Sequence, residues 1–144
     1  MVVTKEARIL IVDADEAIRY TFQRFLAGEG YGPISTAATA TEALALVAQE
    51  KSFDLVICDV MLEDGHGSQL LRQLQSAGVE CPVVMITGSP DIDSALEMVR
   101  LGAFDYVAKP INKQRLLHFA GLALRHRDLQ KEKNRLQAEN EKFR

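Results

Sequence analysis

The feature that most constrains the fold of this chain is a set of four short, mainly apolar runs. Each run is followed directly by a residue with a carboxylate, hydroxyl or amine side chain. The runs cover residues 9–12, 55–58, 82–86 and 104–108, and the residues that follow them are Asp13, Asp59, Thr87 and Lys109. Short continuous apolar runs of this kind are typical of strands buried on both faces of a parallel sheet. In open α/β sheets, sites form at the carboxyl ends of the strands, where loops leave the sheet and converge.

Helical periodicity follows each of these runs, which predicts an alternating fold. The segments concerned are 16–27, a stretch after Thr41, 69–74, 93–101 and the chain from 111 onward. Pro33 precedes a further short run at 34–37, and because proline cannot donate to a strand ladder, we expect this strand at a sheet edge. Right-handed crossovers then predict an α/β, doubly wound, five-stranded parallel sheet with strand order 2-1-3-4-5.

Composition and charge are those of an ordinary globular domain. The chain has 144 residues, of which 47% are hydrophobic and 26% charged, enough for one buried core. Its net charge of −3 argues against direct nucleic-acid binding, although residues 125–144 hold seven Lys or Arg against four Asp or Glu. No apolar run could cross a bilayer and the N-terminus lacks a signal-peptide pattern, so we expect a cytoplasmic protein with no membrane partner.

The residues at the strand ends form a chemically coherent set once the predicted strand order brings them together. Two nearby carboxylates, Asp13 and Asp59, are tolerated when they share a divalent cation, and oxygen ligands with water positions suit Mg²⁺. Lys109 adds a fixed cation and Thr87 a hydroxyl donor, which together suit a phosphoryl group. Taken singly, each residue also fits ordinary loop and turn chemistry. His66 has no partner at ligand spacing, and the pattern favours a surface loop histidine.

Four motifs carry a resemblance to a known family. ILIVDADEAIR, FDLVICDVMLEDGHG, PVVMITG and GAFDYVAKP follow one another in an order and spacing that resembles the receiver domain of bacterial two-component response regulators. The likeness covers roughly residues 7–125 and implies a CheY-like fold, flavodoxin-like in strand order. It also implies a non-enzymatic phosphoacceptor, with at most self-catalysed phosphotransfer and autodephosphorylation.

The resemblance assigns a role to each matching residue. Asp59 becomes the acceptor of a phosphoryl group from a sensor histidine kinase or a phosphotransfer protein. The implied metal is Mg²⁺, and the implied switch pair is Thr87 with Tyr106. The implied metal ligands are Asp13, Asp59 and the backbone carbonyl of Met61, while Lys109 pairs with the phosphoryl group.

Two positions depart from the family pattern. The family usually has adjacent acids after the first strand, but here the second is Ala14; Asp15 either reaches the metal or caps the following helix. We expect the loss of a charge to weaken Mg²⁺ binding. Glu63 stands where the family commonly has proline, which loosens the loop more than it alters the chemistry.

Two other functions stay open at this point. The first is a pseudo-receiver that binds partners without phosphate because Ala14 has removed a metal-pocket acid. The second is a phosphatase of the haloacid-dehalogenase type, since a strand followed by Asp13 and Asp15 also matches that motif. Such enzymes need a further acidic pair after the lysine, whereas only helix follows Lys109 here.

The end of the chain is predicted to be a separate element. We expect the receiver over residues 1–125 and an extended C-terminal linker helix over 126–144, with an output domain beyond it. Leu122, Leu129, Leu136 and Phe143 recur every seven residues, so the helix forms either a solvated linker or a weak parallel coiled coil. A homodimer is expected through this helix or through the face formed by the fourth helix, fifth strand and fifth helix.

Overall fold

A five-stranded parallel sheet forms the centre of the molecule. The computed structural model describes residues 5–50 and 52–142. The strands are β1 (Lys5–Val12), β2 (Tyr31–Ala37), β3 (Leu55–Asp59), β6 (Val83–Thr87) and β7 (Asp105–Ala108), in the order β2-β1-β3-β6-β7. This confirms the predicted doubly wound sheet with order 2-1-3-4-5, and the strand that contains Pro33 lies at an edge as expected.

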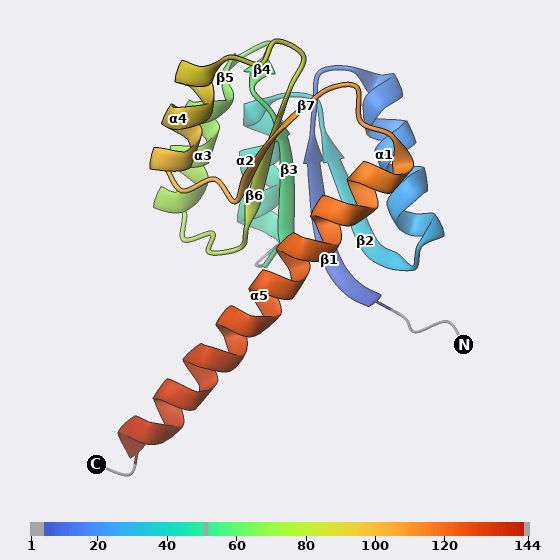
Figure 1. Ribbon diagram of the computed structural model, residues 1–144. Helices are drawn as coiled ribbons and strands as arrows, with labels where there is room; N and C mark the ends of the chain where they lie inside the picture. The colour runs from blue at the N-terminus through green and yellow to red at the C-terminus, as the bar shows by residue number, and fades with distance from the viewer. Residues whose placement is uncertain (1–4, 51, 143–144) are drawn as a thin grey trace.

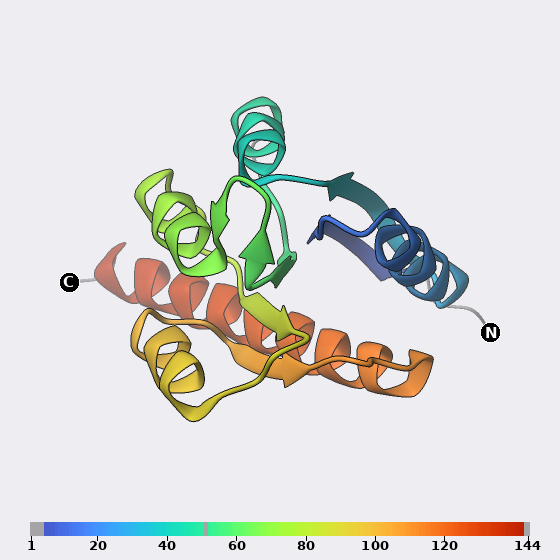
Figure 2. The same ribbon diagram turned by 90° about the horizontal axis from the view of Figure 1, so that it is seen from above.

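Five helices cover the two faces of the sheet. On one face lie α1 (Glu16–Gly28) and α5 (Lys113–Lys142); on the other lie α2 (Ala40–Gln49), α3 (Gly67–Ser76) and α4 (Ile92–Arg100) (Figures 1 and 2). Alternate strand residues point to opposite faces. Ile9 and Ile11 therefore pack in the core toward α1 and α5, while Leu10 and Val12 pack in the core toward the other three helices.

A small hairpin, which the sequence pattern did not predict, follows β3. It consists of β4 (Met61–Leu62) and β5 (Gly65–His66), paired antiparallel at the carboxyl edge of the sheet, near the top of Figure 1. The loop between the two strands is Glu63-Asp64, and an Asp followed by a Gly, here Asp64 and the first residue of β5, is typical of hairpin turns. Gly65 has φ +152°, a backbone conformation that L residues rarely adopt.

Side chains at the helix starts explain where α1 and α3 begin. Asp15 caps α1, one of the two roles left open for it by the sequence, by accepting a hydrogen bond from the Ala17 N–H at 2.9 Å. His66 caps α3, because its Nδ1 accepts from the Ser68 N–H at 3.1 Å, so this half-buried histidine is not a free surface loop residue.

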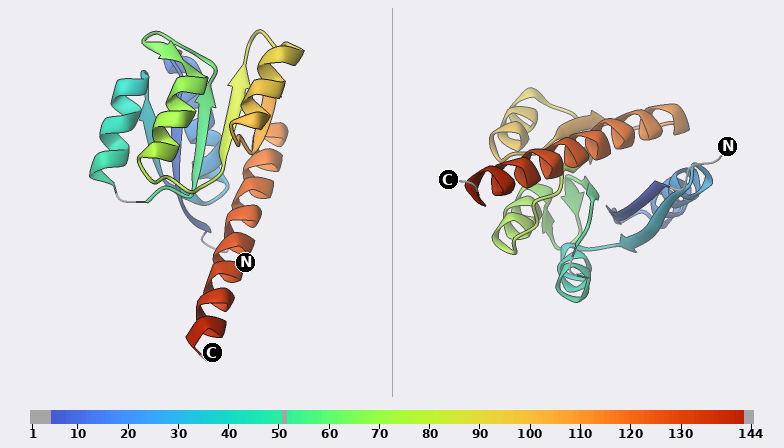
Figure 3. Two further views of the ribbon diagram at one scale, coloured as in Figure 1. Left: turned by 90° about the vertical axis from the view of Figure 1, so that its left-hand side faces the viewer. Right: turned by 90° about the horizontal axis from the view of Figure 1, so that it is seen from below.

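The last helix continues well beyond the sheet. α5 has no break near residue 125 and runs on past the amino edge of the sheet as a single helix to Lys142 (Figures 1 and 3). Beyond residue 127 its side chains are exposed. Within the described residues, no helix combines the length and apolar character needed to span a bilayer.

Candidate functional site

The carboxyl edge of the sheet brings Asp13, Asp59 and Lys109 into direct contact. The Lys109 Nζ lies 2.9 Å from Asp59 Oδ2 and 2.9 Å from Asp13 Oδ2. Backbone pairing beyond the strands fixes this arrangement: the Asp13 N–H donates to the Ala37 carbonyl at 3.0 Å, and the Lys109 N–H donates to the Thr87 carbonyl at 2.7 Å. The Lys109 ammonium therefore contacts both carboxylates at the carboxyl edge of the sheet, which we call the rim.

Asp59 is buried and held by two donors. Its side chain accepts one hydrogen bond from the Met61 N–H, at 3.1 Å to Oδ1, and one from Lys109, at 2.9 Å to Oδ2. The residue is only 7% exposed. The hydrogen bonds fix the plane of the carboxylate, which a nucleophile in phosphoryl transfer requires.

Asp13 is more deeply buried and less completely satisfied. Its Oδ1 accepts from the Asp15 N–H at 2.9 Å, whereas Oδ2 has an ion-pair contact with Lys109 but no well-aligned hydrogen-bond donor. Burial raises the pKa of Asp13, and the charge of Asp59 acts in the same direction, against the lowering effect of Lys109 and the Asp15 N–H. Oδ2 is therefore a buried oxygen that a cation stabilises, and the Lys109 ammonium is the cation beside it.

Lys109 stays charged because of its two partners. Burial alone would lower its pKa, but contact with Asp13 and Asp59 outweighs burial, so the pKa of Lys109 is raised. The ammonium is thus a fixed positive charge at the rim.

Thr87 and Tyr106 lie on the neighbouring strands β6 and β7. Thr87 is buried, and its Oγ1 accepts a hydrogen bond from the Ser89 N–H at 3.0 Å, which leaves the hydroxyl proton for another acceptor. The Tyr106 hydroxyl is buried without a hydrogen-bond partner. An unsatisfied buried phenol costs free energy, so it favours a rearrangement that supplies a partner.

Asp15 does not join the carboxylate pair. Its side chain is exposed and caps α1, and Ala14 beside it is exposed at the rim. Within the described residues, no group of three or more Asp, Glu, His or Cys side chains is arranged to hold a metal ion. Two carboxylates with one backbone carbonyl nevertheless fit Mg²⁺, which usually keeps several waters and binds through one or two carboxylates.

Sequence reasoning missed Gly67, the first residue of α3, which lets the backbone at Asp59 and Val60 approach closely. A Cβ at this position would lie 2.7 Å from the Asp59 carbonyl oxygen and 2.7 Å from Met85 Cε. The Gly67 N–H also donates to the Val60 carbonyl at 2.6 Å. The signal was present as a glycine just before a helix, but only the fold shows what approaches it.

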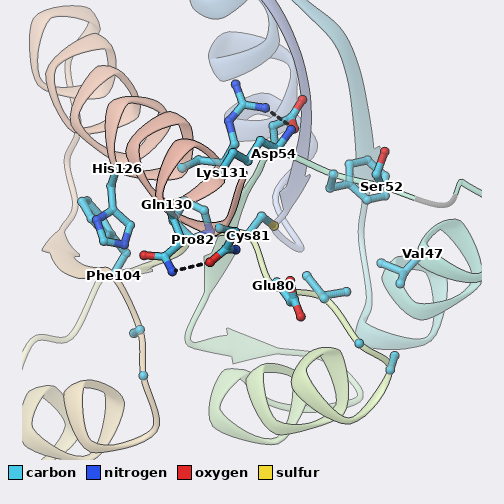
Figure 4. A pocket seen from close by; sticks show the side chains of 18 of the residues that line it. Val47, Ser52, Asp54, Glu80, Cys81, Pro82, Phe104, His126, Gln130 and Lys131 are labelled. Atoms are coloured by element: carbon cyan, nitrogen blue, oxygen red, sulfur yellow. Dashed lines mark hydrogen bonds and ion pairs between the residues drawn. The ribbon is translucent and has the colours of Figure 1, made fainter. Parts of the chain in front are cut away.

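A cleft of about 600 Å³ lies at the opposite edge of the sheet, away from this site (Figure 4). α5 forms one wall, where Arg127 and Lys131 make ion pairs with Asp54, the latter at 3.6 Å, and the His126 ring lies 5.2 Å from that of Phe104. Among the described residues that line it, none belongs to the predicted site. The cleft carries charges of both signs, and we assign it no ligand.

A doubly wound parallel sheet with such a rim defines a signalling fold of the CheY type, and comparison with known proteins identifies the family. The family model described as response regulator receiver domain matches residues 9–120, and the chain belongs to this family. It is 36% identical over 125 residues to the alginate biosynthesis transcriptional regulatory protein AlgB of Pseudomonas aeruginosa, covering 87% of this chain and 27% of that protein.

Solved structures agree with this assignment. A CheY-like response regulator receiver domain protein from Methanospirillum hungatei has a TM-score of 0.80 and 33% identity, covering 88% of this chain and 99% of that one. NtrX from Brucella abortus has a TM-score of 0.85 and 34% identity, covering 92% of this chain and 30% of that one. The chain spans about a quarter of the length of curated transcriptional regulators that it matches. The predicted family resemblance is confirmed.

Proposed function

We propose that this receiver domain accepts a phosphoryl group on Asp59 from the phosphohistidine of a sensor histidine kinase or a phosphotransfer protein. The observation that carries the proposal is the single Lys109 ammonium, which lies 2.9 Å from both Asp59 Oδ2 and Asp13 Oδ2. Such a fixed cation beside a buried acid stabilises a transferred group that bears negative oxygens.

The proposed transfer is an in-line displacement. A carboxylate oxygen of Asp59 forms the new O–P bond while the P–N bond to the donor imidazole breaks, and its electron pair leaves with the imidazole. The Met61 N–H holds the Asp59 carboxylate in orientation, and Lys109 offsets the charge on the phosphoryl oxygens. Because Asp59 is consumed as acceptor, the domain acts as a signalling component with self-catalysed transfer and autodephosphorylation, and not as an enzyme.

The donor set fits Mg²⁺ as the cofactor. Asp13, Asp59 and the Met61 carbonyl would hold it, and its charge would neutralise oxygens of the phosphoryl group. Asp13 contributes Oδ2, a buried oxygen that already faces a cation, the Lys109 ammonium at 2.9 Å. Asp15 would enter this set only by releasing the Ala17 N–H.

Phosphorylation would then switch the surface through Thr87 and Tyr106. The Thr87 hydroxyl proton can donate to a phosphoryl oxygen, and its movement would open space beside β7. The buried Tyr106 hydroxyl, which has no partner in the present state, would gain from such a change.

Partners would read this change at two surfaces. Exposed apolar side chains on α4 are Ile92, Leu96 and Val99, and they suit an output domain or a second copy on the α4, β7 and α5 face. Leu122, Leu129 and Leu136 are also exposed along α5 and offer a second homodimer route. We propose that the domain works in the cytoplasm, beside its kinase, and that this part of the chain does not itself contact nucleic acid.

Phosphorylation by a small donor tests the proposal directly. After incubation with acetyl phosphate and Mg²⁺, mass spectrometry should show one labile phosphoryl group per chain. Asp59→Asn should abolish it, while Asp93→Asn, which removes an exposed acid in the first turn of α4, should retain it. An adduct that survives Asp59→Asn, or none on the natural sequence with any donor, contradicts the proposal.

If the natural sequence takes up no phosphoryl group, a second candidate function is favoured: a pseudo-receiver that binds partners without phosphate. Ala14 and the capping role of Asp15 are the observations in its favour. The phosphatase alternative is weakened because Asp15, its required general acid, is engaged with the Ala17 N–H. Steady turnover of p-nitrophenyl phosphate that needs Asp15 but not Asp59 would restore it.

A further inference from the structure

The tip of the β4–β5 hairpin is tied to a helix far away in the sequence. Asp64 Oδ1 accepts from the Ala40 N–H at 2.9 Å, and Oδ2 accepts from the Thr41 N–H at 3.0 Å and from the Thr41 hydroxyl at 2.8 Å. Three donors from the first turn of α2 therefore converge on one carboxylate. We call this contact the Asp64 clamp.

The clamp completes the N-terminus of α2. The other caps are local, since Thr39 accepts from the Glu42 N–H at 3.1 Å and Glu42 accepts from the Ala38 N–H at 2.7 Å. The amide groups of Ala40 and Thr41 are bonded to Asp64 instead. Helix N-termini favour a negative charge, and these hydrogen bonds lower the pKa of Asp64.

The same hairpin carries the backbone that contacts the acceptor. Met61 lies in β4, and its N–H donates to Asp59 Oδ1 at 3.1 Å. Each hairpin strand has only two residues, and so short a hairpin does not hold its own geometry in water. Leu62 of β4 is buried in the core, the base of the hairpin is held by the Gly67 N–H bond to the Val60 carbonyl, and the tip is held by the Asp64 clamp.

We infer that Asp64 is a positioning residue for phosphotransfer, which holds the Met61 backbone beside Asp59 by fastening the hairpin to α2. The inference rests on the proposed function of Asp59. Asp64 touches none of the reacting groups and acts only through Met61. Small misplacements of groups beside a reacting centre cost rate, so we expect Asp64→Ala to slow phosphorylation by acetyl phosphate roughly tenfold.

A matched variant separates positioning from helix capping. Thr39→Ala removes one of the two local caps of α2 and leaves the hairpin attached, so it should destabilise α2 without slowing phosphorylation. Thr41→Val removes one of the three clamp bonds and should give an intermediate rate. Amide hydrogen exchange on unphosphorylated protein adds a readout independent of the reaction: Asp64→Ala should accelerate exchange at Met61, and Thr39→Ala should not.

Equal phosphorylation rates for Asp64→Ala and Thr39→Ala, or unchanged Met61 exchange in Asp64→Ala, would overturn the inference. A failure of the proposed function is visible separately, because the natural sequence would then take up no phosphoryl group. In that case the Met61 exchange measurement alone decides whether the clamp positions the hairpin.

Discussion

Adding a second acid to the rim by Ala14→Asp should tighten Mg²⁺ binding more than tenfold. Ala14 is exposed beside Asp13, and the neighbouring Asp15 caps α1 and is not directed at the carboxylate pair. Among the residues that the structure describes, the rim therefore offers a cation the two carboxylates of Asp13 and Asp59. Charge count governs the affinity of such sites.

The size of the effect follows from elementary electrostatics. Two unit charges about 4 Å apart interact by about 1 kcal/mol in bulk water, so a divalent cation gains about 2 kcal/mol from one added carboxylate. That corresponds to roughly thirtyfold in affinity at the water limit, and salt screening reduces it. The new carboxylate also repels Asp13 when no metal is bound, which lowers stability until the cation relieves it.

Thermal unfolding during a Mg²⁺ titration measures this effect, because a ligand that binds only the folded state stabilises it by RT ln(1 + c/Kd), where c is the Mg²⁺ concentration. At a given Mg²⁺ concentration, tighter binding therefore gives a higher melting temperature. Calorimetric titration gives the affinity independently. Ala14→Asn adds similar bulk without charge and should bind Mg²⁺ as the natural sequence does. If Ala14→Asp and Ala14→Asn respond to Mg²⁺ alike, a missing charge does not limit the site and the reasoning is refuted.

Two further predictions concern stability. Gly67→Ala should lower the free energy of unfolding in urea by about 2 kcal/mol, because the added Cβ would meet the Asp59 carbonyl oxygen at 2.7 Å. The control Gly28→Ala, whose Cβ would have nothing within 4 Å, should be neutral or stabilising. Equal effects of the two substitutions would rule out the close approach. Lys109→Met should cost about 3 kcal/mol near neutral pH, because it leaves two buried carboxylates without their cation. The pKa of Asp13 is already raised and should rise further in this variant. Above the ordinary pKa of an aspartate, Asp13 therefore keeps its proton in the folded state and has lost it in the unfolded state. The free energy of unfolding then falls as the pH rises through this range. The cost should therefore shrink on acidification, and a cost that grows toward acid would contradict the assignment.

The strands and their order were accessible from sequence because they depend on local signals and general chain rules. Apolar runs mark strands buried on both faces, and the handedness of crossovers leaves few topologies. Asp13, Asp59 and Lys109 were placed together by the same argument, since each follows a strand of one parallel sheet. Their contact distances and the burial of Asp13 needed coordinates.

The features that sequence analysis did not find depend on contacts between segments that are distant in the chain. Asp64 reads as a turn residue in the sequence, and only the packing of α2 beside the hairpin makes it a cap for Ala40 and Thr41. His66 likewise reads as a loop histidine until the start of α3 is known. A side chain that satisfies backbone groups elsewhere leaves no periodic trace, which is why pattern reasoning did not find it.

The predicted domain boundary at residue 125 falls within one continuous helix, α5. Composition changes there because the chain becomes basic, yet Arg127 and Lys131 make ion pairs with Asp54, which precedes β3. The Asp54 side chain also accepts from the Arg8 N–H at 2.8 Å, so the first helical turns beyond residue 125 are fastened to the start of the sheet. These contacts tie α5 to the sheet as far as Lys131, and the boundary at residue 125 stays a prediction. If the proposed switch moves α5, that movement would pass along one continuous helix, because α5 runs unbroken from Lys113 to Lys142.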